Sequence, residues 1–237
     1  ESIPSYRSVP LRGVDLDLRD NINHWGVPPN ALAAVRSVGA AALQGYPAVN
    51  AGALAVTLAE SIGVSPSAIV AGCGSDDVID ACLRAVASPG DRVAHSDPTF
   101  SMLPIFARLN GLEPVAVPLA RDGAADVDAL LATGARVIYL CSPNNPTGTI
   151  TPAAAIRHLI ERAPGVVIVD EAYAEFSGGD DWRVAAVASG RLLVTRTFSK
   201  AWGLAGLRVG YGVGSVALAD AVAKARASGA SWQRIGA

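Results

Sequence analysis

The stretch Thr197-Phe-Ser-Lys200-Ala-Trp-Gly-Leu-Ala-Gly-Leu-Arg208-Val-Gly-Tyr-Gly follows an apolar run and places one lysine among hydroxyl groups, with an arginine eight residues later. The hydroxyls of Thr197 and Ser199 and the guanidinium of Arg208 are suited to binding a phosphate. A lysine amine next to a phosphate anchor can hold a small molecule that carries both an aldehyde and a phosphate. A buried strand end followed by a glycine-rich turn is the alternative that this stretch alone leaves open.

From about residue 66 onward, short apolar runs alternate with segments of helical spacing, which is typical of a parallel α/β layer. The predicted strands are Ala68–Cys73, Arg92–His95, Pro114–Pro118, Arg136–Cys141, Val166–Asp170, Leu192–Thr197 and Arg208–Val213. The predicted helices are Asp76–Ala87, Thr99–Leu109, Pro152–Arg162 and Ser215–Ala227. We therefore expect a three-layer α/β/α fold with a seven-stranded, mostly parallel sheet.

Residues 1–65 have a different pattern, because Pro, Asn and Gly interrupt the segment before residue 31. A helix is predicted over Ala31–Leu43, a turn at Gly45-Tyr46-Pro47 and a second helix over about Ala51–Ile62.

Composition limits the possible classes of protein. With 237 residues, 51% of them hydrophobic, and a net charge of −2, the chain can bury a sizeable core and has no basic excess that would suggest nucleic acid. It contains neither an apolar run of membrane-spanning length nor a signal-peptide pattern. Its three cysteines fit neither a zinc site nor a disulfide framework. We therefore predict a soluble, cytoplasmic protein without a metal, a nucleic-acid partner or a membrane partner.

Polar residues directly follow five of the predicted strands. Because ligands of open α/β sheets bind at the carboxyl ends of the strands, these segments are expected to form a single site. They are Gly74-Ser75-Asp76, Asp97-Pro98-Thr99-Phe100, Ser142–Gly148, Asp170–Tyr173 and Thr197–Lys200.

The candidate residues meet the requirements of pyridoxal 5'-phosphate (PLP), which needs a lysine for its aldehyde, an acid for its pyridine nitrogen, donors for its ring hydroxyl and a phosphate cradle. Lys200 is predicted to form the Schiff base and to act as general base, with a pKa lowered by Arg208 and partial desolvation. Asp170 ends a buried apolar run, where a carboxylate needs a cation such as the pyridinium. A helix N-cap or a metal ligand is the alternative for Asp170.

Three further types of contact complete the predicted PLP site. Tyr173 and Asn145 are expected to donate to the ring oxygen, with Asn145 held extended by the proline that follows it. Ser75 and Asp76 open a predicted helix whose free N–H groups suit the phosphate, although ordinary capping would explain them equally. Phe100 is expected either to stack on the pyridine ring or to belong to the core.

From about Asn21 to Gly214 the chain resembles the fold type I aminotransferases of class I and II, and in particular the branch that contains histidinol-phosphate aminotransferase. The resemblance implies the same cofactor roles for Lys200, Asp170, Tyr173 and Asn145. It implies a phosphate site around Ser75, Asp76, Thr197, Ser199 and Arg208. It also implies a homodimer in which Tyr46 reaches the neighbouring phosphate.

The resemblance further implies a division of the chain into a substrate-side arm, residues 1–45, in which Asn23 contacts substrate, and a PLP-binding large domain, residues 46–237. Two motifs depart from the family pattern: Phe100 stands where tyrosine is usual, and Asn21-Ile-Asn23-His24-Trp25-Gly26 where Asn-Glu-Asn-Pro is common. The sequence stops 37 residues after Lys200, so the smaller C-terminal domain with its carboxylate-binding arginine is expected to be absent.

We therefore predict a PLP-dependent aminotransferase that moves an amino group between an amino acid, such as histidinol phosphate or an aromatic one, and a 2-oxo acid. Three alternatives stay open from the sequence. They are a PLP-dependent amino-acid-phosphate decarboxylase, a PLP-binding domain without turnover, and a fragment of a split or truncated enzyme.

Overall fold

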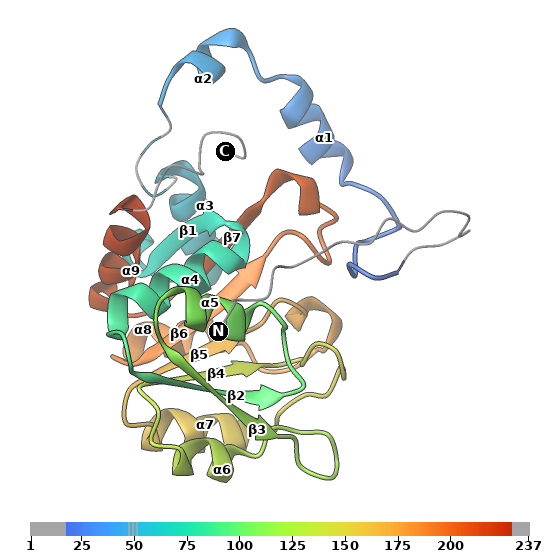
Figure 1. Cartoon of the computed structure of the whole chain (residues 1–237). Coiled ribbons are helices and arrows are strands. Elements are labelled where there is room, and N and C mark those ends of the chain that lie inside the picture. The colour runs from blue at the N-terminus through green and yellow to red at the C-terminus, as the bar shows by residue number, and fades with distance from the viewer. Residues whose placement is uncertain (1–17, 47, 49, 51, 229–237) are drawn as a thin grey trace.

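Seven apolar segments pair into one sheet in the computed structural model, which describes residues 18–46, 48, 50 and 52–228 (Figure 1). The strands are β1 Ile69–Cys73, β2 Arg92–Asp97, β3 Glu113–Pro118, β4 Val137–Cys141, β5 Val166–Asp170, β6 Leu192–Thr197 and β7 Val209–Val213. Their order in the sheet is β1-β7-β6-β5-β4-β2-β3, and β7 alone runs antiparallel to its neighbours β1 and β6. The predicted seven-stranded, mostly parallel sheet is confirmed.

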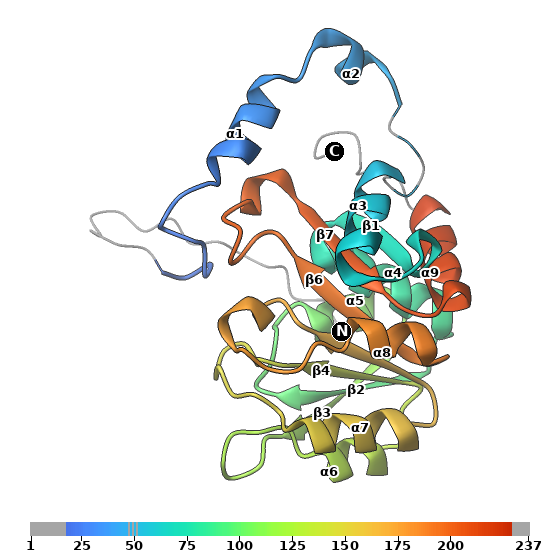
Figure 2. The same cartoon turned by 180° about the vertical axis from the view of Figure 1, so that it is seen from behind.

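Helices cover both faces of the sheet, as Figures 1 and 2 show from opposite sides. One face carries α4 Gly74–Val86, α5 Leu103–Leu109 and α9 Val216–Ser228, and the other carries α6 Val127–Ala132, α7 Ala153–Arg162 and α8 Arg183–Ala188. Side chains of β4 alternate between the two cores: Val137 and Tyr139 pack with the first set of helices, and Ile138 and Leu140 with the second. Strands β4 and β5 are buried along their whole length, which explains their continuous apolar sequence.

The helix predicted over Ala31–Leu43 is instead two helices, α1 Pro29–Arg36 and α2 Ala40–Gln44. The chain between them is not helical, and Gly39 has an extended backbone. Ser37 and Gly39 have weak helix propensity. Packing against a core could compensate for this, but no side chain of either helix is buried in the described arm. The prediction of one helix was wrong for this reason.

Other helix boundaries differ from the prediction by a few residues. Helix α5 begins at Leu103 rather than Thr99, because residues 98–102 form a turn after β2. Ser75 lies inside the first turn of α4 rather than at its N-cap, which is Cys73. The six-residue helices α6 and α8 were not predicted, since they are too short to show a helical period.

The arm, residues 18–46, extends away from the sheet before the chain returns through α3 Gly52–Ile62 (Figures 1 and 2). Helix α3 packs on Ile69, Tyr211 and Val213 beside the edge of the sheet. None of the helices in the described part of the chain has both the length and the apolar character needed to cross a membrane.

Candidate active site

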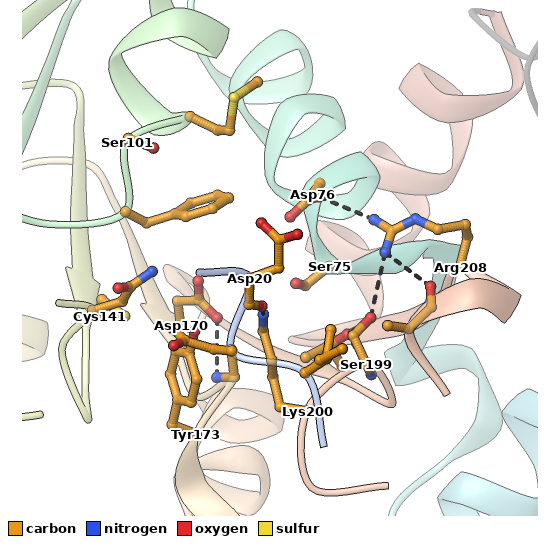
Figure 3. A pocket seen from close by; sticks show the side chains of 18 of the residues that line it. Asp20, Ser75, Asp76, Ser101, Cys141, Asp170, Tyr173, Ser199, Lys200 and Arg208 are labelled. Carbon is orange, nitrogen blue, oxygen red and sulfur yellow. Dashed lines mark hydrogen bonds and ion pairs between the residues drawn. The ribbon is translucent and has the colours of Figure 1, made fainter. Parts of the chain in front are cut away.

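The carboxyl ends of the parallel strands border a cavity of about 650 Å³ (Figure 3). All of the predicted site residues line it except Asn23 and Tyr46. The predicted residues that line it are Ser75, Asp76, Phe100, Asn145, Asp170, Tyr173, Thr197, Ser199, Lys200 and Arg208. Segments up to 133 residues apart in sequence, from Ser75 to Arg208, therefore meet at one edge of the sheet, as the topology rule predicts.

Lys200 lies in the cavity between Asp170 on one side and Ser199 and Arg208 on the other (Figure 3). Its Nζ donates to the backbone carbonyl of Asp20 at 2.8 Å. Partial burial lowers the pKa of this amine, and the positive charge of Arg208 lowers it further. The negative charges of the nearby carboxylates, of which Asp76 has the largest effect, act in the opposite direction and raise the pKa. The predicted direction is confirmed, with desolvation as the larger cause, and the shift favours the neutral, nucleophilic amine.

Asp170 is the last residue of β5 and is only 3% exposed. Its Oδ1 accepts hydrogen bonds from Thr195 Oγ1 at 3.0 Å and from the backbone N–H of Ala172 at 3.2 Å, and its Oδ2 accepts one from the Tyr139 hydroxyl at 2.6 Å. Burial raises the pKa of this carboxyl group, and the side-chain hydrogen bonds oppose the rise. A buried carboxylate of this kind is suited to a cationic partner from the cavity.

The two alternatives for Asp170 receive no support from its surroundings. The next helical turn, η3 Ala174–Phe176, begins after Tyr173, so Asp170 is not its N-cap. Across the residues that the structure describes, no three His, Cys, Asp or Glu side chains are grouped in a way that could hold a metal ion.

Arg208 precedes β7 in a left-handed conformation, with φ of 50°, and points its guanidinium at the start of α4. Its Nη2 lies 3.1 Å from Asp76 Oδ2, and its Nη1 donates to Ser199 Oγ at 3.4 Å. The hydroxyl of Thr197 donates to Ser199 Oγ at 3.0 Å. A cation and two hydroxyls are thus gathered at this end of the cavity.

Glycines allow the start of α4 to approach β7 closely. A Cβ at Gly210 would lie 2.3 Å from the backbone N of Ser75, and a Cβ at Gly74, whose φ is +80°, would lie 2.8 Å from Arg208 Nη2. The first turn of a 13-residue helix, whose N–H groups have no partner within the helix, therefore faces the same end of the cavity as Arg208.

This donor set fits PLP. Anion-binding groups gather around Arg208 at one end of the cavity, a buried carboxylate lies at Asp170, and the lysine amine lies between them. Phe100 lines the cavity and also packs against the core, and its stacking on a pyridine ring stays a prediction. The Tyr173 hydroxyl accepts a hydrogen bond from Asn21 Nδ2 at 3.1 Å.

Adjacent asparagines in the turn after β4 have different surroundings. Asn145 lines the cavity, whereas Asn144 is buried and accepts a hydrogen bond from Thr99 Oγ1 at 2.9 Å while donating to the Pro98 carbonyl at 3.1 Å. Asn144 therefore joins two of the loops that surround the cavity. Nothing in the sequence pattern indicated this role.

Two predicted residues lie elsewhere. Asn23 Nδ2 donates to the Ala201 carbonyl at 2.8 Å, so Asn23 holds the lysine loop, while its neighbours Asp20 and Asn21 line the cavity. Tyr46 is 85% exposed at the end of the arm. Contact of Asn23 with substrate and of Tyr46 with a neighbouring subunit stay predictions.

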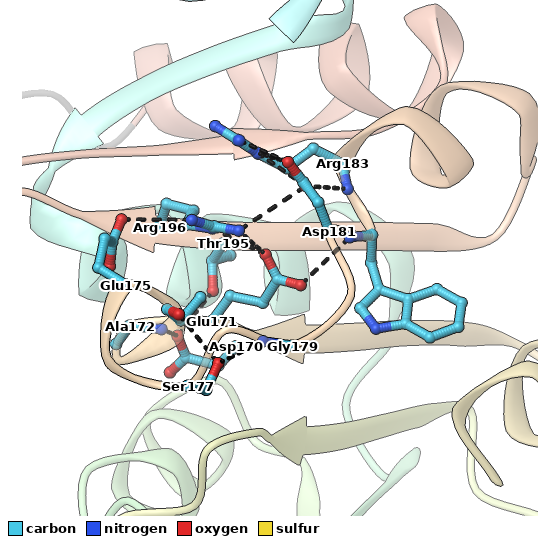
Figure 4. Close-up of polar contacts among 12 residues, drawn as sticks. Asp170, Glu171, Ala172, Glu175, Ser177, Gly179, Asp181, Arg183, Thr195 and Arg196 are labelled. Carbon is cyan, nitrogen blue, oxygen red and sulfur yellow. Dashed lines mark hydrogen bonds and ion pairs between the residues drawn. The ribbon is translucent and has the colours of Figure 1, made fainter. Parts of the chain in front are cut away.

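A buried ionic network supports the loop that follows Asp170 (Figure 4). Arg196 bonds Glu171 through Nε and Nη2, both at 2.7 Å, and its Nη1 lies 3.2 Å from Glu175 Oε1. Glu171 is 2% exposed and also accepts from the backbone N–H of Trp182 at 3.3 Å. Sequence reasoning missed this network, although an arginine between Thr195 and Thr197 in a buried strand was a signal for it.

Comparison with known protein families matches residues 15–237 to the model described as aminotransferase class I and II. The chain belongs to this family. The match covers most of the sequence and confirms the family resemblance inferred from the motifs.

Individual relatives agree with the family. Histidinol-phosphate aminotransferase of Ruegeria pomeroyi is 39% identical over 217 residues, which are 89% of this chain and 60% of that protein. Aromatic amino acid aminotransferase of Corynebacterium glutamicum is 40% identical over 187 residues, which are 76% of this chain and 55% of that protein. The chain thus spans less than two thirds of the length of these relatives.

The solved structure of histidinol-phosphate aminotransferase from Sinorhizobium meliloti, in complex with PLP, superposes with a TM-score of 0.79 at 29% identity. The superposition covers 89% of this chain and 63% of that one. It confirms the predicted fold, and it confirms PLP as a cofactor within the family.

Proposed function

We propose that this chain binds PLP in the cavity and that the protein transfers an amino group from an amino acid to a 2-oxo acid. The observation that carries the proposal is the position of the Lys200 amine in one cavity between a buried carboxylate, Asp170, and the anion-binding groups around Arg208. Membership of the family supports it.

In this proposal the groups around Arg208 hold the phosphate. Arg208 and the hydroxyls of Ser75, Thr197 and Ser199 make charge-assisted hydrogen bonds to its oxygens, and the first turn of α4 adds backbone N–H groups. Asp76 orients the guanidinium of Arg208.

In the same proposal, residues on the opposite side of the cavity hold the pyridine ring of PLP and set its protonation. When bound, PLP supplies an electron-withdrawing ring that stabilises negative charge on the substrate carbon. Asp170 keeps the ring nitrogen protonated, Tyr173 and Asn145 donate to the ring oxygen, and Phe100 covers one ring face. Lys200 first anchors the cofactor; its Nζ then takes the α-proton of the substrate and returns a proton in the next step.

The proposed amino donors are histidinol phosphate and aromatic amino acids, because a histidinol-phosphate aminotransferase and an aromatic amino acid aminotransferase match at 39% and 40% identity.

We also propose a homodimer in which Tyr46 reaches the neighbouring site, a proposal supported by the exposure of this side chain and of apolar side chains along the arm. Residues 46–237 would be the PLP-binding domain and residues 1–45 the arm. A cytoplasmic location is supported by three free cysteines.

An absorption spectrum of the purified protein with PLP tests the function. We expect a visible band that borohydride reduction fixes on Lys200, as peptide mapping would show, and that amino donors convert to the pyridoxamine form with release of the corresponding oxo compound, which is an oxo acid for an amino-acid donor. Lys200→Ala should lose both the fixed cofactor and the transfer. Full transfer by Lys200→Ala would contradict the role of the lysine, and release of CO2 in place of an oxo acid would identify a lyase.

A further inference from the structure

We propose that Tyr139 is a positioning residue for Asp170: its buried hydroxyl directs the carboxylate and keeps it anionic, so that the cofactor ring nitrogen stays protonated. This inference rests on the proposed binding of PLP. It concerns a side chain outside the cavity lining, whose hydroxyl donates to Asp170 and which also contacts the lining residue Cys141.

The position of Tyr139 in the sheet explains how it reaches Asp170. It carries the only hydroxyl within Val137–Cys141, and it is completely buried in the core beneath α4 and α5. In the β4–β5 register Tyr139 is opposite Ile168, and Cys141 is opposite Asp170. Tyr139 and Asp170 are therefore diagonal neighbours on adjacent strands, a separation that a long aromatic side chain can span.

The hydrogen bonds of Asp170 leave room for one more donor. A carboxylate offers about four lone-pair sites. Among the described residues, two donors, Thr195 Oγ1 and the Ala172 N–H, use Oδ1, while Tyr139 is the one donor to Oδ2. Oδ2, the oxygen that Tyr139 contacts, could therefore accept a further hydrogen bond, such as one from the ring N–H of PLP when it is bound.

The hydroxyl of Tyr139 remains a donor throughout the neutral pH range. Burial raises its pKa well above the ordinary value, and the neighbouring Asp170 raises it further. A hydroxyl that donates at 2.6 Å to a carboxylate makes a strong, charge-assisted bond that stabilises the anion in surroundings where water cannot do so. Without it, the proton shared between Asp170 and the ring nitrogen would shift toward Asp170.

Nitrogen-15 NMR of the protein loaded with PLP labelled at the ring nitrogen measures that proton directly. We expect the wild-type signal at the protonated position and the Tyr139→Phe signal moved toward the unprotonated one. We also expect PLP affinity to fall about tenfold or more, as for loss of a hydrogen bond to a charged group. A Tyr139→Phe signal that coincides with the wild-type signal would overturn the inference.

Tyr211→Phe is the matched control, because Tyr211 is also buried, at 5% exposed, and its hydroxyl accepts from Arg183 Nη1 at 2.9 Å outside the cavity. Tyr211→Phe should lose a hydroxyl without moving the nitrogen signal. A movement equal to that of Tyr139→Phe would show that Tyr139 acts only through packing.

Asp170→Asn distinguishes failure of the Tyr139 inference from failure of the proposed PLP site. This variant should move the nitrogen signal to the unprotonated position, and an unchanged signal would refute the assignment of Asp170 itself.

A measurement on the wild type covers the case in which Tyr139→Phe does not fold. The hydroxyl proton of a short O–H···O⁻ bond resonates at low field, and we expect such a signal from Tyr139 that moves upfield in Asp170→Asn. Absence of the low-field signal in the wild-type protein would count against the inference.

Discussion

The floor of the cavity and the arm, whose residues 19–22 also line the cavity, are held by different means. Asp170 receives its hydrogen bonds from β4, from β6 and from its own loop, and the same strands form the apolar core. The helices of the arm bury no side chain among the described residues, and three of its contacts with the site are the single hydrogen bonds of Asp20, Asn21 and Asn23.

The core and the arm hold residues of the site with different strength. Groups that hold a charge in a fixed direction are attached to the core, where displacement would expose apolar surface. The arm residues Asp20, Asn21 and Asn23 contact the site through exposed or half-buried hydrogen bonds, each of which contributes only about 1 kcal/mol. Local opening of the arm therefore costs much less than opening of the floor.

The largest expected effect lies beneath the floor, in the Glu171–Arg196 pair. Glu171→Gln leaves a buried guanidinium with less negative charge around it, and we expect a loss of about 3 kcal/mol in the free energy of unfolding, measured with urea. Glu175→Gln, which removes the more exposed partner of the same arginine, should cost about 1 kcal/mol or less. Equal losses of unfolding free energy from the two variants would contradict the inference that the buried partner of Arg196 contributes more than the more exposed one.

Two asparagines compare a bond to the sheet with a bond of the arm. Asn50 bonds β1 twice, by donating to the Ile69 carbonyl at 2.9 Å and by accepting from the Ala71 N–H at 3.1 Å, and its φ is 57°. We expect Asn50→Ala to cost about 2 kcal/mol, from two lost hydrogen bonds and a left-handed backbone. Asn23→Ala in the arm should cost less than about 1 kcal/mol. Urea unfolding of both variants would show whether the arm contributes as little as we infer.

The smallest expected effect is a shift in pH dependence at Lys200, which lies between the two regions. Burial lowers the pKa of its amine, and the negative charge of Asp76 opposes this by favouring the ammonium form. Asp76→Asn removes that charge, so the pKa should fall further and the amine should be neutral at lower pH. The midpoint for borohydride-fixed attachment of PLP, titrated against pH, should therefore move down.

Asp80→Asn is the control for this shift, because Asp80 lies on the same helix, at the surface, and pairs with Arg84 at 3.2 Å. Its midpoint should match that of the wild type. A midpoint that rises in Asp76→Asn would show that loss of the contact with Arg208 outweighs the effect on the lysine.

Much of the fold and the site could be predicted because both depend on local pattern. Strands β4 and β5 are continuous apolar runs, and polar residues follow the strands where a parallel sheet requires its ligands. Lys200 and Asp170 were therefore found from the sequence as lining residues of one cavity.

The remainder depends on contacts between distant segments. Tyr139 is indistinguishable in sequence from an ordinary core residue, since its partner is fixed by the register of two strands. Asn144 was missed because its partners, Thr99 and the Pro98 carbonyl, belong to another loop that only the tertiary structure brings close. The break between α1 and α2 was missed because a helix without a packing partner follows weak local preferences.

The antiparallel direction of β7 has a further consequence for the ligand. Lys200 follows β6 and Arg208 precedes β7, so both residues belong to one connection, 198–208, between two paired strands. The spacing between the proposed covalent anchor and the proposed ionic anchor thus depends on a single short segment. Insertion or deletion of one residue within 201–207 should therefore alter the spacing of Lys200 and Arg208, while the parallel strands that form the rest of the cavity keep their places.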